Sequence, residues 1–230
     1  MSTLSTFSKI KPRLIMFDLD GTLVDSVPDL AFAVDAMLAE IGEAEAGLEQ
    51  VRLWVGNGAQ MLVKRALSRN MIPIDIDDAR LEQATGSFFR HYQQVNGLRS
   101  QLYPQVLETL THLRNTVPYL ALVTNKPELF TQPLLDHHQL PLFDLVVCGD
   151  TLASKKPDPA QLLYCLEIFG CHPQETLMVG DSLSDIKAAQ AANIPIICVK
   201  YGYNQGEDLS AYQPELLIEG FDELLGVLGL

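Results

Sequence analysis

Two aspartates, Asp18 and Asp20, directly follow the apolar run Leu14–Phe17. Such an unbroken apolar run is typical of a strand buried on both faces. Because side chains alternate along an extended chain, Asp18 and Asp20 are expected to point the same way, and Gly21 then permits a sharp exit. Two carboxylates about 5 Å apart repel each other by roughly 3 kcal/mol at an effective dielectric of about 20. The pair therefore favours a shared cation or one retained proton.

The DxDG string alone is equally compatible with a surface turn, since Asp and Gly are common turn residues. It does not fit a calcium-binding EF-hand loop, because Asp29 stands where that loop needs a bidentate Glu. A strand-like run, rather than a helix, also precedes it. Its interpretation depends on the rest of the chain.

More polar side chains follow other predicted strands or the loops after them: Thr124, Asn125, Lys156 and Asp181, with Asp185 one helical turn further on. The separation along the chain from Thr124 to Lys156, and that from Lys156 to Asp181, are each close to one strand-helix unit of about 30 residues. Each has a plainer interpretation: Thr124 and Asn125 as helix caps, and Lys156 as a solvated surface lysine. Their common position at strand ends, where α/β sheets bind ligands, favours one shared site.

These groups together define a kind of chemistry. Carboxylate oxygens are hard ligands that favour Mg²⁺ over softer metals. The five histidines lie away from the strand ends, so no serine or cysteine triad is indicated. The nucleophile is therefore predicted to be a carboxylate, as in aspartyl-phosphate chemistry.

The elements that must position these residues follow from periodicity. After Tyr103, helices alternate with predicted strands over residues 119–124, 143–148, 176–179, 194–199 and 215–218. This alternation predicts an α/β fold with a doubly wound, Rossmann-like parallel sheet covered on both faces.

Residues 27–97 show helical periodicity and almost no strand pattern, with helices predicted over 26–41, 59–67 and 81–95. Ser26 and Asp29 are predicted to form a capping box at the first of these. We expect a core domain of residues 1–25 and 99–230, and a small α-helical cap domain of residues 26–98. The cap leaves the sheet beside Asp18 and Asp20, so it is expected to cover the site.

Four strings occur in the order FDLDGTLVDS, VTNK, KKPDP and GDSLSD, and they resemble the four motifs of the haloacid dehalogenase superfamily. The second aspartate of the first string resembles the phosphatase branch. The strings WVGNGA, LVTNKP and YGYNQGEDL resemble the members that act on 2-phosphoglycolate. The resemblance implies a Mg²⁺-dependent phosphomonoester hydrolase that converts 2-phosphoglycolate to glycolate.

The resemblance also implies roles for individual residues. Asp18 attacks phosphorus and becomes an aspartyl phosphate, while Asp20 acts as general acid and then as general base. Thr124 and Asn125 bind phosphoryl oxygens. Lys156 offsets the negative charge, and it is preferred to Lys155 because it directly precedes the proline.

The resemblance places Mg²⁺ on Asp18, the backbone carbonyl of Asp20, and Asp181, with Asp185 supporting them. Gly56, Asn57 and Gly58 are candidates for a turn that faces the substrate, although a plain helix entry explains them equally well. The same core motifs occur in sugar-phosphate phosphatases, phosphomutases and pyrophosphatases, so these activities remain alternatives. A non-enzymatic phospho-acceptor domain is a more remote alternative.

Composition limits the partners. A formal net charge of −13 argues against a nucleic-acid partner, whose phosphates need a basic face. The four cysteines form no metal-binding spacing, and a buried reduced thiol is expected at Cys148 and Cys198. No apolar run is long enough to span a membrane, and the N-terminus lacks the apolar region of a secretory signal. We expect a cytoplasmic protein that binds a small phosphorylated metabolite, as a monomer or a homodimer.

Overall fold

A six-stranded parallel sheet forms the centre of the computed structural model, which describes residues 11–140 and 142–230. Its strand order is β5-β4-β1-β6-β7-β8. The strands are β1 (Leu14–Phe17), β4 (Tyr119–Val123), β5 (Leu145–Val147), β6 (Thr176–Gly180), β7 (Ile196–Val199) and β8 (Leu216–Ile218). Central β1 pairs with β4 and β6, which explains its unbroken apolar run. From β1 the chain adds β4 and β5 on one side of the sheet and then β6, β7 and β8 on the other, so the direction of winding changes between β1 and β6. A doubly wound sheet binds its ligands at this point.

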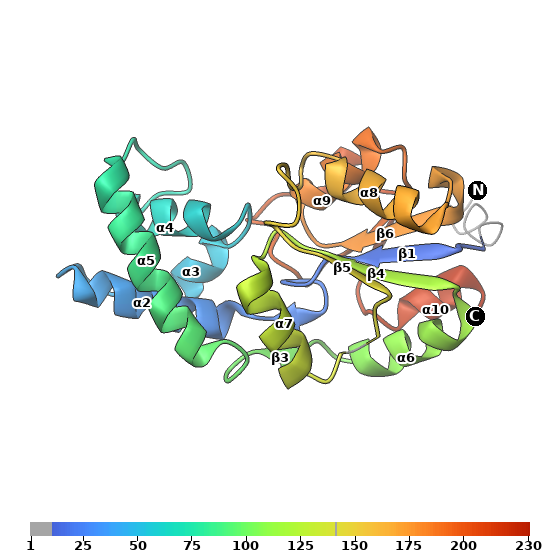
Figure 1. The fold of residues 1–230 in the computed structure, drawn as a ribbon, viewed down its shortest axis with the longest axis horizontal. Coiled ribbons are helices and arrows are strands. Elements are labelled where there is room, and N and C mark those ends of the chain that lie inside the picture. Colours follow the sequence, from blue (N-terminus) through green and yellow to red (C-terminus); the bar gives the residue numbers. More distant parts are fainter. Residues whose placement is uncertain (1–10, 141) are drawn as a thin grey trace.

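Helices cover both faces of the sheet, as predicted (Figure 1). On one face lie α8 (Ala160–Phe169) and α9 (Leu183–Ala191), whose apolar residues share a core with Leu14 and Met16. On the other lie α6 (Val106–Thr116), α10 (Glu223–Leu228) and the second half of α7 (Glu128–His137). The predicted α/β fold is confirmed.

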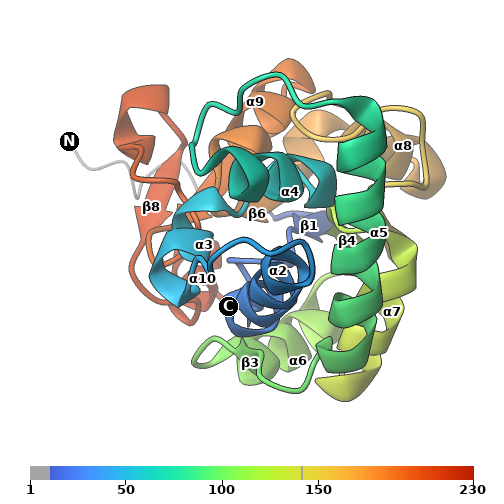
Figure 2. The ribbon, with the colours of Figure 1, turned by 90° about the vertical axis from the view of Figure 1, so that its left-hand side faces the viewer.

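A separate group of helices, α2 (Val27–Glu40), α3 (Leu48–Trp54), α4 (Ala59–Ser68) and α5 (Asp78–Val95), faces the viewer in Figure 2. These helices pack around their own apolar core. Phe130 of α7 joins that core, with its ring 4.8 Å from the ring of Tyr92. The helical character of this region agrees with its periodicity. The domain boundaries at residues 25/26 and 98/99 remain a proposal.

A short antiparallel pair lies where the chain crosses between the sheet and these helices. Strand β2 (Val24–Asp25) pairs with β3 (Gln101–Leu102). Asp25 also accepts hydrogen bonds from Arg52 of α3, at 3.1 and 3.3 Å, and from the Tyr203 hydroxyl at 2.6 Å. The two crossing segments are thus tied to each other and to both parts of the molecule.

The predicted capping box of Ser26 and Asp29 is wrong. The Ser26 side chain makes no cap hydrogen bond and instead donates to Asp20 Oδ1 at 2.5 Å. Asp29 is fully buried and accepts hydrogen bonds of 2.9–3.2 Å from three backbone N–H groups, those of Gly97, Arg99 and Ser100. Both side chains have tertiary partners, which local spacing does not reveal.

No helix within residues 11–140 and 142–230 has the length and apolar character needed to cross a bilayer. The first ten residues, where no secretory signal is predicted, lie outside the described residues. Cys148 and Cys198 are buried free thiols, as expected, and so are Cys165 and Cys171.

Candidate active site

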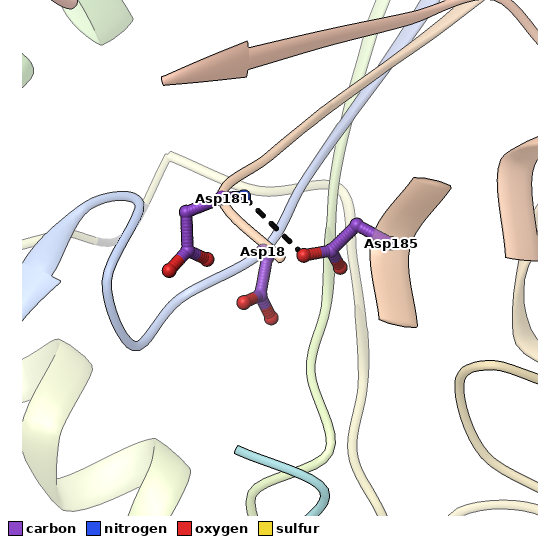
Figure 3. A group of neighbouring side chains, drawn as sticks. All are labelled: Asp18, Asp181 and Asp185. Carbon is purple, nitrogen blue, oxygen red and sulfur yellow. Dashed lines mark hydrogen bonds between the residues drawn. The ribbon is translucent and has the colours of Figure 1, made fainter. Parts of the chain in front are cut away.

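Three buried carboxylates, those of Asp18, Asp181 and Asp185, converge at the carboxyl ends of β1 and β6 (Figure 3). Each offers an oxygen within 4.8 Å of the others. Strands β1 and β6 pair in register up to Phe17 and Val179, so the residues that follow them lie side by side. Asp185 lies in the first turn of α9, where its carboxylate accepts hydrogen bonds from the backbone and side chain of Ser182.

The carboxylate of Asp181 is closely packed and hydrogen-bonded through both of its oxygens. Thr22 Oγ1 donates to Asp181 Oδ1 at 3.0 Å, and the Tyr203 N–H donates to Oδ2 at 2.5 Å. Two glycines make this possible, because a Cβ on either Gly21 or Gly202 would lie 2.2 Å from an Asp181 side-chain atom. Gly21 also has a φ of +92°, a conformation that favours glycine.

One lysine, Lys156, provides the positive charge at the cluster. Its Nζ donates to Asp18 Oδ1 at 2.6 Å, to Asp185 Oδ1 at 2.7 Å and to the Val123 carbonyl at 2.7 Å. The Lys155 ammonium lies instead beside Gly58 in the turn before α4. Of the two lysines, Lys156 is therefore the one that contacts the carboxylates.

The electrostatics of the cluster favour a cation. Burial, opposed by Lys156, raises the pKa of Asp18 to about 7. Burial and the neighbouring carboxylates also raise the pKa of Asp181 well above its ordinary value. Burial alone would lower the pKa of Lys156, but Asp18 and Asp185 raise it, so this residue remains an ammonium ion. One ammonium against three buried carboxylates leaves excess negative charge, and a hard divalent ion such as Mg²⁺ fits this oxygen donor set.

The side chain of Asp20 lies outside this cluster and has its own partners. Lys126 Nζ donates to both Asp20 oxygens, at 2.9 and 3.1 Å, and Ser26 donates to one of them. Sequence reasoning missed Lys126, although it closes the VTNK string; its role depends on a residue more than a hundred positions away. The predicted contribution of Asp20 to metal binding is through its backbone carbonyl and remains a prediction.

Thr124 and Asn125 lie beside Lys156 at the end of β4. Thr124 Oγ1 accepts a hydrogen bond from the Lys126 N–H at 3.1 Å. Asn125 Nδ2 donates to the Lys156 carbonyl at 2.8 Å. Neither side chain caps α7; the N–H of Glu128, the first residue of that helix, donates instead to Asp150 Oδ1 at 2.9 Å.

A buried glutamine that the sequence analysis missed, Gln161, joins these loops. Its Oε1 accepts from the Lys156 N–H at 3.1 Å, and its Nε2 donates to the carbonyls of Thr124 and Cys148 at 3.2 and 2.8 Å. The only sequence signal is a glutamine at the start of the largely apolar helix α8.

The turn Gly56–Gly58 brings the helical region to the site. It lines a cavity of about 90 Å³ that it shares with Asp18, Asp20, Thr124, Asn125 and Lys156. Asn57 Nδ2 donates to Ser184 Oγ at 3.1 Å, across the gap to α9. All of the predicted site residues except Asp185 thus line one cavity between the helical region and the sheet.

The fold and this acidic cavity define the class of protein. Residues 15–199 match the family of haloacid dehalogenase-like hydrolases, and the chain belongs to that family. The predicted family and the prediction of an enzyme are thereby confirmed.

Three similar proteins illustrate the relationship. A phosphoglycolate phosphatase of Pseudomonas putida is 51% identical over 215 residues, which is 93% of this chain and 79% of that protein. One from Aliivibrio fischeri is 49% identical over 220 residues, covering 95% and 97% of the two chains. The crystal structure of a predicted phosphoglycolate phosphatase from Haemophilus somnus is 34% identical and superposes with a TM-score of 0.88, over 95% of this chain and 99% of that one.

Proposed function

We propose that this chain is a Mg²⁺-dependent phosphomonoester hydrolase that converts 2-phosphoglycolate to glycolate and inorganic phosphate. The observation that carries the proposal is the buried group of Asp18, Asp181, Asp185 and Lys156, with the cavity beside it. The names of its relatives from Pseudomonas putida and Aliivibrio fischeri support the choice of substrate.

Asp18 is the proposed nucleophile. Lys156 holds Asp18 Oδ1, which leaves Oδ2 to attack phosphorus in line with the ester oxygen. A bond forms between Asp18 and phosphorus while the bond from phosphorus to the ester oxygen breaks. The ammonium of Lys156 opposes the negative charge that gathers at this position.

Asp20 is the proposed general acid and base. It gives a proton to the departing ester oxygen and then takes one from the water that attacks the aspartyl phosphate. That second attack releases phosphate and restores the Asp18 carboxylate. Ser26 and Lys126 fix the Asp20 carboxyl for both steps.

Mg²⁺ would be held by Asp18, Asp181 and the Asp20 carbonyl, with Asp185 behind them, and would supply charge neutralisation for the phosphoryl group. Thr124 and Asn125 are proposed to bind phosphoryl oxygens beside Lys156. The Gly56–Gly58 turn faces the remainder of the substrate. The buried free thiols are consistent with a reducing compartment, and we propose a cytoplasmic location.

A substrate panel tests this function. Phosphate release from 2-phosphoglycolate, glucose phosphates and pyrophosphate is compared with and without Mg²⁺. We expect the highest kcat/KM for 2-phosphoglycolate, and loss of turnover on adding a chelator. A clear preference for a glucose phosphate or for pyrophosphate would overturn the substrate assignment. Turnover that survives chelation would overturn the role of the metal.

A further inference from the structure

Helix α4 carries a buried arginine that the proposed mechanism does not use. Arg65 is only 7% exposed and lies on the buried face of α4 with Leu62, Val63 and Ala66. Its partners are carbonyl and amide oxygens, and no carboxylate within the described part of the chain pairs with its guanidinium. Removing a cation from water costs several kcal/mol, so these oxygen contacts must compensate for its burial.

The guanidinium of Arg65 binds the segment that leads into α4. Its Nη1 donates to the carbonyls of Trp54 and Gly56, at 2.7 and 3.3 Å, and its Nη2 donates to Asn57 Oδ1 at 3.1 Å. Its Nε donates to the Met71 carbonyl at 3.1 Å. One side chain thus joins the end of α3, the turn at the cavity and the loop that follows α4.

The backbone of this turn has to be held in place. Gly56, Asn57 and Gly58 have φ values of +121°, +64° and +89°. A residue other than glycine adopts such a conformation at a cost of about 1 kcal/mol, so the conformation of Asn57 depends on its surroundings. Gln205 Nε2 donates to the Val55 carbonyl at 2.6 Å from the side of the sheet domain, and Arg65 supports the turn from within the helical region.

The contact with Arg65 also fixes which way the Asn57 amide points. Because Oδ1 accepts from the guanidinium, the amide nitrogen points away from it and donates to Ser184 Oγ at 3.1 Å. The reversed amide would set its N–H groups against those of the guanidinium. Asn57 and Ser184 both line the cavity that contains Asp18. An amide nitrogen has two N–H groups, so one stays available for an oxygen of the substrate.

We propose that Arg65 is a positioning residue that keeps the Asn57 amide nitrogen toward the cavity, where it binds an oxygen acceptor on the alcohol part of the substrate. This inference rests on the proposed phosphatase function and assigns part of its substrate selectivity to a side chain behind the cavity wall. In 2-phosphoglycolate the acceptor is the carboxylate. Ethyl phosphate has the same chain length and lacks this acceptor.

The first test measures kcat/KM for these two substrates. In Arg65→Met the ratio of 2-phosphoglycolate to ethyl phosphate is expected to fall about tenfold, mainly through a higher KM for 2-phosphoglycolate. Arg69→Met is the matched control, because Arg69 also ends α4 and donates to backbone carbonyls, those of Ala44 and Glu45, but is exposed and does not line the cavity. An unchanged ratio in Arg65→Met, or an equal fall in Arg69→Met, would overturn the proposal.

Arg65→Lys covers the case in which Arg65→Met does not fold. It keeps the positive charge and most of the length of the side chain. One ammonium group cannot reach both Met71 and Asn57, which lie on opposite sides of the guanidinium. The ratio is therefore expected to fall in this variant too, and a wild-type ratio in Arg65→Lys would overturn the need for the guanidinium.

The second test addresses the polarity of the turn. Asn57→Asp keeps an acceptor for Arg65, tolerates the positive φ and replaces the amide donor by a carboxylate oxygen. The turn then presents an acceptor to the acceptor of the substrate, and the ratio is expected to fall at least as far as in Arg65→Met. If Asn57→Asp kept the wild-type ratio, the amide nitrogen would not be the group that recognises the substrate.

The third test asks whether Arg65 acts through Asn57. Asn57→Gly removes the side chain and allows the positive φ, and Arg65→Met is then added to it. In this background the change at Arg65 is expected to lower the ratio by no more than about twofold, against about tenfold in the wild type. A full further tenfold fall would show that the two residues act independently and would overturn the positioning role.

The wild-type ratio separates this inference from the proposed function. If the wild type fails to prefer 2-phosphoglycolate over ethyl phosphate, the substrate assignment itself fails. If the wild type shows that preference and the folded Arg65 variants retain it in full, only the role of Arg65 fails.

Discussion

At the scale of the residue, Lys156 holds the site together. Its Nζ contacts Asp18 and Asp185 at 2.6 and 2.7 Å in a setting almost closed to water. An ion pair of this kind is costly to break from one side, because the remaining charges stay buried without a partner. In the proposed mechanism, Lys156 thus both positions Asp18 and offsets its negative charge.

Replacing Lys155 and Lys156 one at a time distinguishes a catalytic role of the ammonium group from a general effect of losing a positive charge. Lys156→Met is expected to lower kcat for phosphate release by about 10²–10³-fold, the usual cost of losing one preorganised donor at a developing charge. Lys155→Met removes the same charge one residue away and is expected to stay close to wild type in kcat. Thermal unfolding of both variants establishes that they are folded. Equal losses in kcat would contradict the assignment of Lys156.

Strand-end position made part of the site predictable. Asp18, Asp181 and Lys156 each follow an apolar strand or its loop, and their spacing fits strand-helix units, so their meeting could be expected from the sequence. Lys126 and Gln161 could not be found this way. Their significance comes from partners distant in the chain, which no local pattern encodes.

At the scale of the element, the sequence predicted those helices and strands whose buried face gives a regular pattern of apolar residues. Strand β1 and the alternating helices after residue 103 follow directly from their apolar patterns. Elements that depend on tertiary contacts escaped it: the two-residue strands β2 and β3, helix α3, and the partners of Ser26 and Asp29. Elements this short, and contacts made by single polar side chains, produce no periodic pattern of apolar residues in the sequence.

The buried carboxylate of Asp29 links the first and last segments of the helical region. Asp29→Ala would leave two buried N–H groups and one partly buried N–H group without their acceptor, at a cost of about 3 kcal/mol in the free energy of unfolding. For a chain of this size the melting temperature would fall by about 6–12 °C. Asp136→Asn, an exposed change on α7, is the control for loss of a carboxylate. Equal melting temperatures for the two variants would show that the Asp29 contacts contribute nothing.

At the scale of the whole molecule, the buried carboxylates link stability to pH. The pKa of Asp18 rises from 3.8 to about 7 on folding, mainly through burial. The folded protein therefore binds more protons than the unfolded chain between those values, so stability falls as pH rises through this window. Asp181 acts in the same direction, since its pKa is also raised.

Metal-free protein is accordingly expected to lose stability between about pH 5 and pH 8, by about 2 kcal/mol or 4–8 °C in melting temperature. The difference between wild type and Asp18→Asn isolates this effect. Burial lowers the pKa of His138, which makes stability rise with pH, but this contribution is common to both proteins. If the melting temperatures of the wild type and of Asp18→Asn changed with pH in parallel, the link between stability and Asp18 would be contradicted. Added Mg²⁺ should stabilise the wild type most at the higher pH.

The most direct test of the account is the rate of phosphate release from 2-phosphoglycolate by wild type and by Asp18→Asn, both with saturating Mg²⁺. Asn keeps the size of the side chain but removes the attacking carboxylate. We expect the variant to remain folded and to lose at least about 10³-fold in kcat. A folded Asp18→Asn variant that releases phosphate at the wild-type rate would contradict the proposal that this carboxylate attacks phosphorus.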